Sequence, residues 1–344
     1  MREHRDYRER RYLSAVEAAR YLDITVKELH KLAASEAIGC KVSASGQKRF
    51  DISELKRFEK NRPRPTAEKT GFSPVQSIRV NGTSQRIFVK SSTDMTEIDS
   101  DSVHIVVTSP PYFNAKLYSK TPLEGDLGNI HNLDEWFDKI ALVWGEVFRV
   151  LQPGRRAFVN IMNLPVRVGK GYRTLNLMGR TVGVMEKMGF IFKRDIVWHK
   201  TNGVRAHFGT YPYPGGILIN NMHEFILEFQ KPERKGFDKY GHLTKEQKEK
   251  SRLDKEFWLL LKNSDVWTMP PEGSGDRRAH VAPFPLELPY RLIKAFTYVG
   301  ETALDPFMGS GATLLAAASL ERNGVGYEIV PEIARQAFEN IKGR

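Results

Sequence analysis

The sequence predicts an α/β protein in which one large sheet carries helices on both faces and a small helical module precedes it. Three observations indicate this fold. A β-branched apolar run from Asp101 to Thr108 stops at a diproline, and residues 300–320 read as a strand, a glycine-rich turn and a helix. Three helix-capping sequences also crowd into the first 60 residues. Strands that alternate with helices are typical of a sheet covered on both sides.

Length and charge narrow the class of protein. The chain has 344 residues, enough for one large domain and a small appendage. No stretch approaches the roughly 20 apolar residues of a membrane helix, and residues 1–11 lack the apolar centre of a secretory signal, so we expect a cytoplasmic protein without membrane contact. The net charge of +12 favours a polyanionic partner such as nucleic acid, although a basic surface that serves only solubility fits it equally well.

The first 62 residues predict a separate module of three short helices and a β-hairpin. Each helix opens with a capping box, in which a Ser, Thr or Asp precedes a Glu by three positions. Only Asp23 and Ile24 separate the first two helices, and Cys40–Phe50 places polar turn residues around Gly46 between two short β-like arms. The three boxes are Ser14 with Glu17, Thr25 with Glu28, and Asp51 with Glu54.

This arrangement resembles the winged helix-turn-helix of the excisionase and MerR-like family, whose second helix lies in the DNA major groove while the wing contacts the backbone. The resemblance implies a DNA-binding module over residues 1–62, although a small packing domain without a ligand is the alternative. The residues expected to contact DNA are Lys27, His30 and Lys31 on the second helix and Lys48 and Arg49 at the wing.

A linker is predicted over residues 63–77, which carry three prolines and few apolar residues. We therefore expect the large domain to span residues 78–344. No internal repeat and no long low-complexity tract interrupts it.

The strand that ends at Thr108 leads into a rigid corner, Ser109-Pro110-Pro111-Tyr112. In open α/β sheets ligands bind beyond the carboxyl ends of the strands, where this corner falls. The proline carbonyls accept hydrogen bonds, Ser109 adds a hydroxyl and Tyr112 adds an aromatic face. The corner therefore predicts a binding site for an amino group, and a proline-stiffened loop without a role is the alternative.

Residues 300–313 predict a second ligand site at the end of another strand. Their glycines let a cofactor approach the backbone, and the helix that follows offers free amide donors. About 20 residues later a short strand ends in Glu328, a carboxylate placed to accept from ribose hydroxyls, although surface acids at strand ends are common. The turn is neither a phosphate loop nor the three-glycine dinucleotide fingerprint.

Together, Thr108–Tyr112 and Asp305–Gly311 resemble the amino-methyltransferases that act on DNA. That family carries a catalytic signature Ser/Asp/Asn-Pro-Pro-Tyr/Phe and a cofactor signature Asp-Pro-Phe-x-Gly-Ser-Gly, and both are matched without a gap. The catalytic motif comes first by almost 200 residues, as in the β class of the family. Segments between and beside the motifs extend the resemblance to roughly residues 78–343.

The resemblance implies a Rossmann-like fold, S-adenosylmethionine as cofactor and double-stranded DNA as substrate. It also suggests a homodimer, a cognate restriction endonuclease, and a target-recognition region at roughly residues 202–283. The implied catalytic residues are Ser109, Pro110, Pro111 and Tyr112. The implied cofactor-binding residues are Asp94, Phe284, Asp305, Pro306, Phe307, Gly309, Ser310, Gly311, Thr313 and Glu328.

The cysteine content narrows the reaction. Methylation of a base carbon needs a cysteine thiolate, and the single cysteine, Cys40, lies in the N-terminal module, so this reaction is disfavoured. One thiol also excludes an internal disulfide and a multi-cysteine zinc site, and we predict no metal centre. An exocyclic amine needs no covalent step, but acceptors such as the Ser109 hydroxyl and the Pro110 carbonyl must localise its lone pair.

The target base is predicted to flip out of the duplex and stack on Tyr112, with Phe113, Trp198 and Phe208 as candidate walls of the slot. The sequence Ser-Pro-Pro-Tyr resembles the cytosine-N4 members more than the adenine-N6 members, so cytosine is favoured and adenine is the alternative. Two alternatives belong to another class: a DNA-binding regulator with an inactive methyltransferase body, and an enzyme that methylates an RNA or protein amine.

Overall fold

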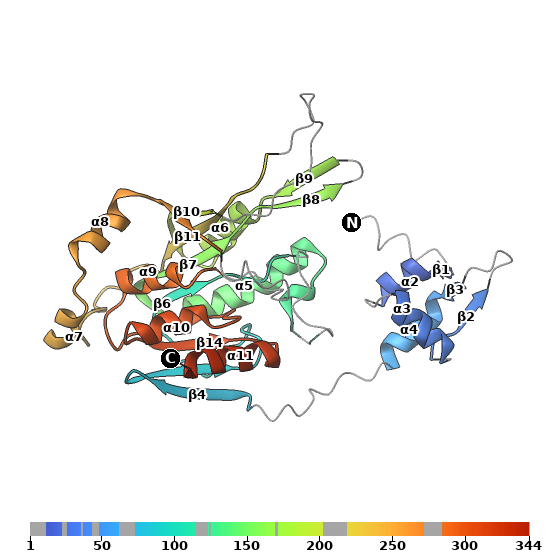
Figure 1. Ribbon diagram of the computed structural model, residues 1–344, viewed down its shortest axis with the longest axis horizontal. Coiled ribbons are helices and arrows are strands. Elements are labelled where there is room, and N and C mark those ends of the chain that lie inside the picture. The colour runs from blue at the N-terminus through green and yellow to red at the C-terminus, as the bar shows by residue number, and fades with distance from the viewer. Residues whose placement is uncertain are drawn as a thin grey trace. The chain divides into compact units, whose positions relative to one another are not determined.

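The computed structural model divides the chain into two compact units, Met1–Thr70 and Gly71–Arg344 (Figure 1). Each unit has its own hydrophobic core. The structure describes residues 12–22, 26–35, 37–42, 48–61, 73–113, 123, 125–168, 171–201, 219–271 and 284–343.

The N-terminal unit combines short helices with a three-stranded antiparallel sheet of order β1-β3-β2. Leu13, Leu29, Phe50 and Leu55 are fully buried and join the helices to the sheet. The helices are α2 (Ala15–Tyr21), α3 (Val26–Ala34) and α4 (Ile52–Asn61), and the strands are β1 (Tyr12–Ser14), β2 (Cys40–Val42) and β3 (Lys48–Asp51).

Two of the local signals in this unit are confirmed, the capping box at Ser14 and the pairing of the two arms. At the start of α2, Glu17 N donates to Ser14 Oγ at 3.3 Å and Ser14 N donates to Glu17 Oε2 at 2.8 Å, which completes the predicted capping box. At the start of α4, Ser53 N donates to Asp51 Oδ1 at 2.9 Å. The two predicted arms pair as β2 and β3. Thr25 and the turn between the arms lie outside the described residues.

Among the described residues, the second unit is built on a nine-stranded sheet of order β12-β10-β11-β7-β6-β13-β14-β5-β4. The five central strands, β7 to β5 in this order, run parallel, while β11 and β4 run antiparallel to their neighbours β7 and β5. The strands are β4 (Val75–Val80), β5 (Thr83–Phe88), β6 (Val103–Thr108), β7 (Leu151–Ile161), β10 (Ile191–Lys200), β11 (His223–Gln230), β12 (Val266–Met269), β13 (Thr302–Asp305) and β14 (Asn323–Tyr327).

Helices cover both faces of this sheet, as the sequence predicts. Alternate residues of β6 face opposite ways: Val106 packs with Trp136 of α5, whereas Ile105 and Val107 pack with Leu292 of α9. No described helix is long and apolar enough to cross a membrane. The helices are the 3₁₀ turn η1 (Leu127–Asn129), α5 (Leu133–Val150), α6 (Leu177–Lys187), α7 (Lys245–Lys250), α8 (Lys255–Asn263), α9 (Glu287–Phe296), α10 (Ala312–Ser319) and α11 (Pro331–Lys342), and a separate hairpin is formed by β8 (Leu164–Val168) and β9 (Gly171–Leu175).

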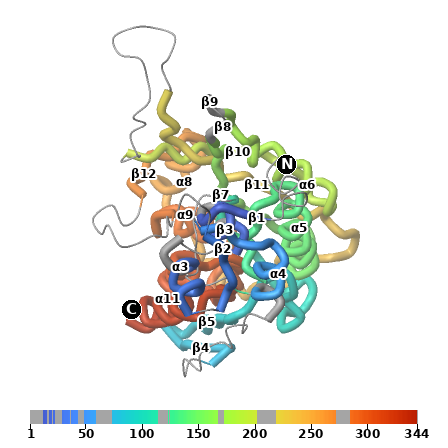
Figure 2. The backbone as a smooth tube through the Cα atoms, turned by 90° about the vertical axis from the view of Figure 1, so that its right-hand side faces the viewer, coloured from blue at the N-terminus to red at the C-terminus, as the bar shows by residue number. Residues whose placement is uncertain are grey.

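The first and last elements of the unit lie side by side, because Ile78 of β4 packs with Ala334 and Ile341 of α11 (Figure 1, Figure 2). Strand β4 begins at Val75 and pairs with β5 along its length. The predicted linker, residues 63–77, is therefore too long at its end: its last three residues belong to the sheet, since pairing with β5 outweighs their polar composition.

Strand β11 lies inside residues 202–283, the stretch expected to hold target recognition, and is hydrogen-bonded on both sides, to β7 and to β10. Ile226 and Leu227 are fully buried. This part of the stretch is therefore sheet interior and does not form a free recognition surface.

Candidate active site

Three motif-bearing strands end at one edge of the sheet. β13 pairs in parallel with β6 and with β14, in registers that place Leu304 beside Val106 and beside Val325. The corner after β6, the glycine-rich turn after β13 and Glu328 after β14 therefore lie together, although they are far apart in the sequence. The carboxyl ends of parallel strands are where open α/β sheets bind ligands.

A cavity opens at this edge, with an empty volume of about 930 Å³ that includes its open mouth. Ten of the fourteen residues that the sequence assigned to the catalytic and cofactor sites line the cavity. They are Ser109, Pro110, Pro111, Tyr112, Phe284, Pro306, Phe307, Gly309, Ser310 and Glu328.

Asp305 and Thr313 do not line the cavity, contrary to the sequence assignment, but are buried behind it. Asp305 accepts hydrogen bonds from Thr108 Oγ1 at 2.6 Å, Thr313 Oγ1 at 2.7 Å and Phe307 N at 3.0 Å. Burial raises the pKa of Asp305 to about 6, while the three donors favour its ionised form. The carboxylate thus ties the turn after β13 to the end of β6 and sets the position of the cavity wall.

The two glycines of the turn serve different purposes. Gly309 lines the cavity with a φ of +50°, and a Cβ built on it would meet no atom within 4 Å, so the backbone is open to a ligand there. Gly311 is the left-handed N-cap of α10, with a φ of +89°, and a Cβ on it would lie 3.1 Å from the Cβ of Ala337 in α11. Gly311 is therefore needed for helix packing and does not line the cavity.

Asp94 also lies off the cavity. Its carboxylate pairs with Lys90 at 3.3 Å and accepts from Thr96 N at 3.1 Å, and hydrogen bonding by Lys90 lowers its pKa. Lys90 itself lines the cavity and is held by Glu97 at 2.8 Å. The residues of this segment that line the cavity are thus Lys90, Ser91 and Ser92, which the sequence reasoning missed.

Two acids face the cavity from different segments. Burial raises the pKa of Glu328 to about 7, and the neighbouring Asp126 charge adds to the rise. Glu328 Oε1 accepts from Val330 N at 2.8 Å, and Asp126 Oδ1 accepts from Gly128 N at 2.8 Å. Asp126 was missed, although an acid between two glycines after the catalytic corner was a usable signal. The pair can accept hydrogen bonds from the hydroxyls of a ligand.

The aromatic residues near the corner divide into one cavity residue and two core residues. Tyr112 lines the cavity and donates its hydroxyl to the buried Glu224 at 2.6 Å. Phe113 packs edge-on against Trp136, and Trp198 is buried with its indole N–H on the Met269 carbonyl at 3.1 Å. Phe113 and Trp198 therefore do not wall a base slot here, since packing in the core holds their rings. Phe208 lies outside the described residues.

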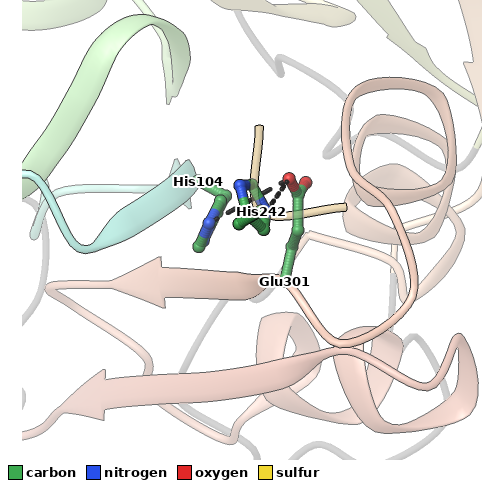
Figure 3. A group of neighbouring side chains, drawn as sticks. All are labelled: His104, His242 and Glu301. Atoms are coloured by element: carbon green, nitrogen blue, oxygen red, sulfur yellow. Dashed lines mark hydrogen bonds and ion pairs between the residues drawn. The ribbon is translucent and has the colours of Figure 1, made fainter. Parts of the chain in front are cut away.

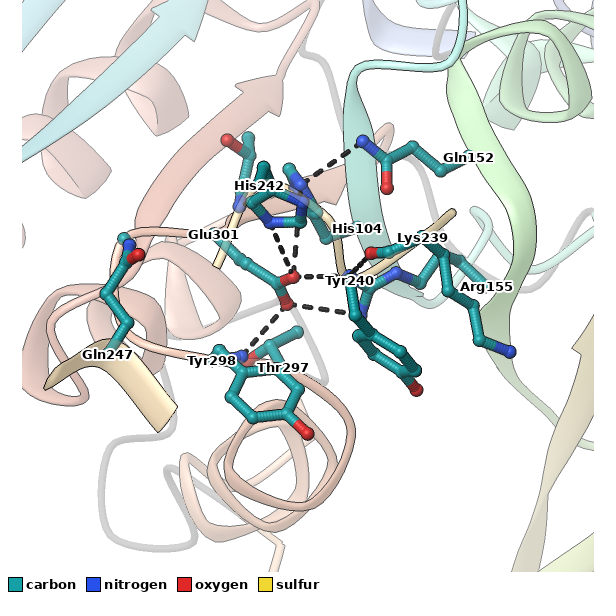
Figure 4. A network of polar contacts seen from close by, with 12 residues as sticks. His104, Gln152, Arg155, Lys239, Tyr240, His242, Gln247, Thr297, Tyr298 and Glu301 are labelled. Atoms are coloured by element: carbon teal, nitrogen blue, oxygen red, sulfur yellow. Dashed lines mark hydrogen bonds and ion pairs between the residues drawn. The ribbon is translucent and has the colours of Figure 1, made fainter. Parts of the chain in front are cut away.

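A second polar cluster lies at the opposite, amino-terminal ends of β6 and β13. It brings together His104, His242 and Glu301 (Figure 3). Glu301 is buried and accepts hydrogen bonds from both terminal nitrogens of Arg155, from Tyr298 N at 2.9 Å and from His242 Nε2 at 3.1 Å (Figure 4).

The ring nitrogens of His104 already contact other groups of the protein. Thr302 N donates to His104 Nδ1 at 3.1 Å, and His104 Nε2 lies 3.3 Å from Gln152 Nε2 and 4.0 Å from Glu301 Oε1. Burial, together with the nearby Arg155 charge, lowers the pKa of His104 to about 3. The cluster is therefore an ion-pair network that holds the segment around His242 to the sheet.

The residues expected to contact DNA are placed in part. His30 and Lys31 on α3 and Arg49 on β3 are exposed, and Lys48 is half-buried. The side chain of Lys27 lies outside the described residues.

This fold and this cavity define an α/β methyltransferase, in which the proline corner and the glycine-rich turn end neighbouring strands. The model of the DNA methylase family matches residues 103–339. The chain therefore belongs to the DNA methylase family and is an S-adenosylmethionine-dependent DNA methyltransferase.

Similar proteins agree with this assignment. The type II methyltransferase M.MthZI of Methanothermobacter thermautotrophicus is 32% identical over 72% of this chain and 73% of its own length. M.MjaI of Methanocaldococcus jannaschii is 31% identical over 72% and 88%. The structure of a presumed DNA modification methylase of Thermus thermophilus, complexed with S-adenosyl-L-methionine, is 35% identical with a TM-score of 0.58 over 74% of this chain and 93% of that one.

Proposed function

We propose that the chain transfers a methyl group to the exocyclic amino nitrogen of a base flipped out of duplex DNA, and that cytosine N4 is the favoured target. The observation that carries this proposal is the position of Ser109-Pro110-Pro111-Tyr112 in the wall of the same cavity as Gly309 and Glu328. A base at the corner and a cofactor at the glycine-rich turn would be neighbours. A base inside a duplex cannot enter such a cavity, so the target must flip out.

The residues of the cavity fit S-adenosylmethionine, which supplies an electrophilic methyl group on a sulfonium sulfur. The open backbone at Gly309 leaves room for close approach. Glu328 and Asp126 offer buried carboxylates to ribose hydroxyls. We propose that these three residues, with Phe284 and Ser310 beside them, hold the cofactor.

The corner supplies what an exocyclic amine needs. The lone pair of such an amine is delocalised into the base ring and must be localised before the nitrogen attacks. The Ser109 hydroxyl and the Pro110 carbonyl accept from the two N–H groups, which favours a pyramidal nitrogen and stabilises the positive charge that develops on it. Tyr112 stacks on the base and aligns it, and alignment supplies much of the remaining rate.

Two features of the sequence support the choice of target base and target atom. Ser109 stands where the adenine-N6 enzymes more often carry Asp, so cytosine N4 is favoured. Cys40, the only thiol of the chain, is half-buried in β2 of the N-terminal unit, which argues against a covalent step at a base carbon.

Nucleoside analysis tests the reaction. Plasmid or phage DNA is incubated with the protein and methyl-labelled S-adenosylmethionine, digested to nucleosides and analysed by mass spectrometry. We expect label in N4-methylcytosine. Label in N6-methyladenine would keep the mechanism and correct the base. Label in RNA or protein alone, or in nothing while the cofactor still binds, would overturn the proposal.

We further propose that the N-terminal unit is a winged helix-turn-helix that tethers the enzyme to DNA. Residues 1–62 contain 15 basic and 10 acidic residues, and His30, Lys31 and Arg49 are exposed on the second helix and the hairpin. A second DNA contact raises affinity through effective concentration and leaves the chemical step unchanged.

The double variant Lys31→Ala/Arg49→Ala tests the tether. Each lost phosphate contact should lower the slope of log affinity against log salt by about one, so we expect weaker DNA binding at low salt and an unchanged kcat at saturating DNA. Arg57→Ala on α4 is the matched control, since this arginine is 75% exposed but lies outside the second helix and the hairpin. Equal losses in the two variants, or a lower kcat, would contradict the tether.

We also propose a homodimer and a cognate restriction endonuclease, on the strength of the family resemblance and the type II names of the relatives. Sedimentation velocity should give a species of twice the 39.3 kDa chain mass. A monomer at every protein concentration would contradict the proposed dimer. If a candidate endonuclease cuts methylated plasmid as readily as unmethylated plasmid, it is not the cognate partner.

A further inference from the structure

We propose that Glu224 is a positioning residue for methyl transfer, which fixes the Tyr112 ring in the orientation that receives the base. The inference rests on the proposed function of the corner. It concerns a group of four side chains that the sequence motifs do not contain together: Tyr112, Asn160, Lys200 and Glu224.

The sheet topology brings the four side chains to the cavity edge. β11 runs antiparallel to β7, so Glu224, near the start of β11, lies at the edge where β6 and β7 end. Asn160 is next to last in β7, and Lys200 is the last residue of β10, which pairs antiparallel with β11. Three strands and the corner after β6 therefore each deliver one group to this edge.

The contacts converge on the Glu224 carboxylate. Tyr112 Oη and Asn160 Nδ2 each donate to Oε2 at 2.6 Å, and Lys200 Nζ donates to Oε1 at 3.0 Å. Glu224 is 5% exposed, so the Lys200 ammonium supplies the counter-charge that a buried carboxylate requires. Both ends of Tyr112 are thus held, the backbone by Pro111 and the hydroxyl by Glu224.

This network is arranged for orientation more than for stability. Asn160 Oδ1 is buried and has no hydrogen-bond partner in the part of the chain that the structure describes, so the amide is held through its donor side, which binds Glu224. A tyrosine that only fills a core needs no buried ion pair behind its hydroxyl. A tyrosine that must present a fixed ring face to an incoming base gains from one, because a misplaced platform slows the reaction.

A double-mutant cycle with Glu224→Gln and Tyr112→Phe tests the proposal. Glu224→Gln removes the charge that strengthens this hydrogen bond, and Tyr112→Phe removes its donor. We therefore expect kcat to fall about 10- to 100-fold in each variant and no further in the double variant. The S-adenosylmethionine Kd should stay within about twofold, since neither change touches the acids or the glycine-rich turn. Tyr112→Phe removes a single hydroxyl, so it keeps the test open should Glu224→Gln fold poorly.

Glu228→Gln is the matched control. Glu228 lies on the same strand, is similarly buried, and is paired with Arg156 at 3.0 Å and Arg194 at 3.2 Å, but it lies near the end of β11 that points away from the cavity edge. It should lower the melting temperature and leave kcat unchanged. A kcat loss in Glu228→Gln equal to that in Glu224→Gln, multiplying losses in the double variant, or a full kcat in Tyr112→Phe would each overturn the inference. A wild type that labels no base would instead overturn the proposed function.

Discussion

Lowering the pH should weaken S-adenosylmethionine binding through Glu328. Burial raises the pKa of this carboxyl from 4.5 to about 7, and ribose hydroxyls that donate to it favour the ionised form, so binding releases a proton and affinity rises with pH. For a pKa near 7 and a bound form that stays ionised, the apparent Kd scales as 1 + 10^(pKa−pH). Binding should then be about tenfold weaker at pH 6 than at pH 8, or about 1.4 kcal/mol.

Isothermal titration calorimetry at pH 6, 7 and 8, in two buffers of different ionisation enthalpy, measures both the affinity and the released proton. Glu328→Gln resembles the protonated acid at every pH. We expect it to bind more than tenfold more weakly than wild type at pH 8 and to lose the Glu328 contribution to the pH dependence.

Asp94→Asn is the matched control, because Asp94 is an acid beside the cavity that does not line it. It should retain the wild-type pH dependence. Two results would refute the reasoning. One is a plot of log Kd against pH that has the same slope in Glu328→Gln as in wild type, and the other is a loss of this slope in Asp94→Asn. Without cofactor the sign is opposite: a carboxyl whose folded pKa is raised makes folding less favourable as the pH rises from about 4.5 to 7.

Three further outcomes are expected. Glu301→Gln leaves the buried Arg155 without its counter-charge and should lower the free energy of unfolding, measured in urea, by about 3–5 kcal/mol. Glu246→Gln, in an exposed ion pair, should leave the unfolding midpoint unchanged. Coincident unfolding curves for Glu301→Gln and wild type would contradict this prediction. Gly311→Ala places a Cβ in a left-handed residue against α11 and should cost about 1–2 kcal/mol, so a wild-type melting temperature would contradict it. S-adenosylmethionine at 100 times its Kd should stabilise the second unit by about 2.7 kcal/mol, and an unshifted melting transition would count against cofactor binding there.

The sequence could predict the elements whose signals are local. The β6 strand and its proline corner, the glycine-rich turn before α10 and the capping box at Ser14 each depend on a few consecutive residues. Ten of the fourteen assigned site residues line the cavity because the two motifs end neighbouring strands.

The remainder depends on contacts between distant segments. Asp305 belongs to the cofactor signature, but its side chain turns to Thr108, 197 residues earlier, and no local pattern encodes that direction. Glu224 reads as an ordinary strand residue until β11 is placed beside β7. Val75 reads as the end of a linker until β5 pairs with it.

The contact between β4 and α11 has a consequence for chain order. Because Ile78 of β4 and Ile341 of α11 share one buried cluster, a peptide bridge between these two elements would join neighbours in the fold. A polypeptide closed in this way, lacking the N-terminal unit and opened in the turn between α7 and α8, would carry the glycine-rich turn before the proline corner. The same cavity would form, because β6 and β13 remain partners in the sheet. The order of the two motifs along the chain thus depends only on where the termini lie, and the site does not require one order or the other.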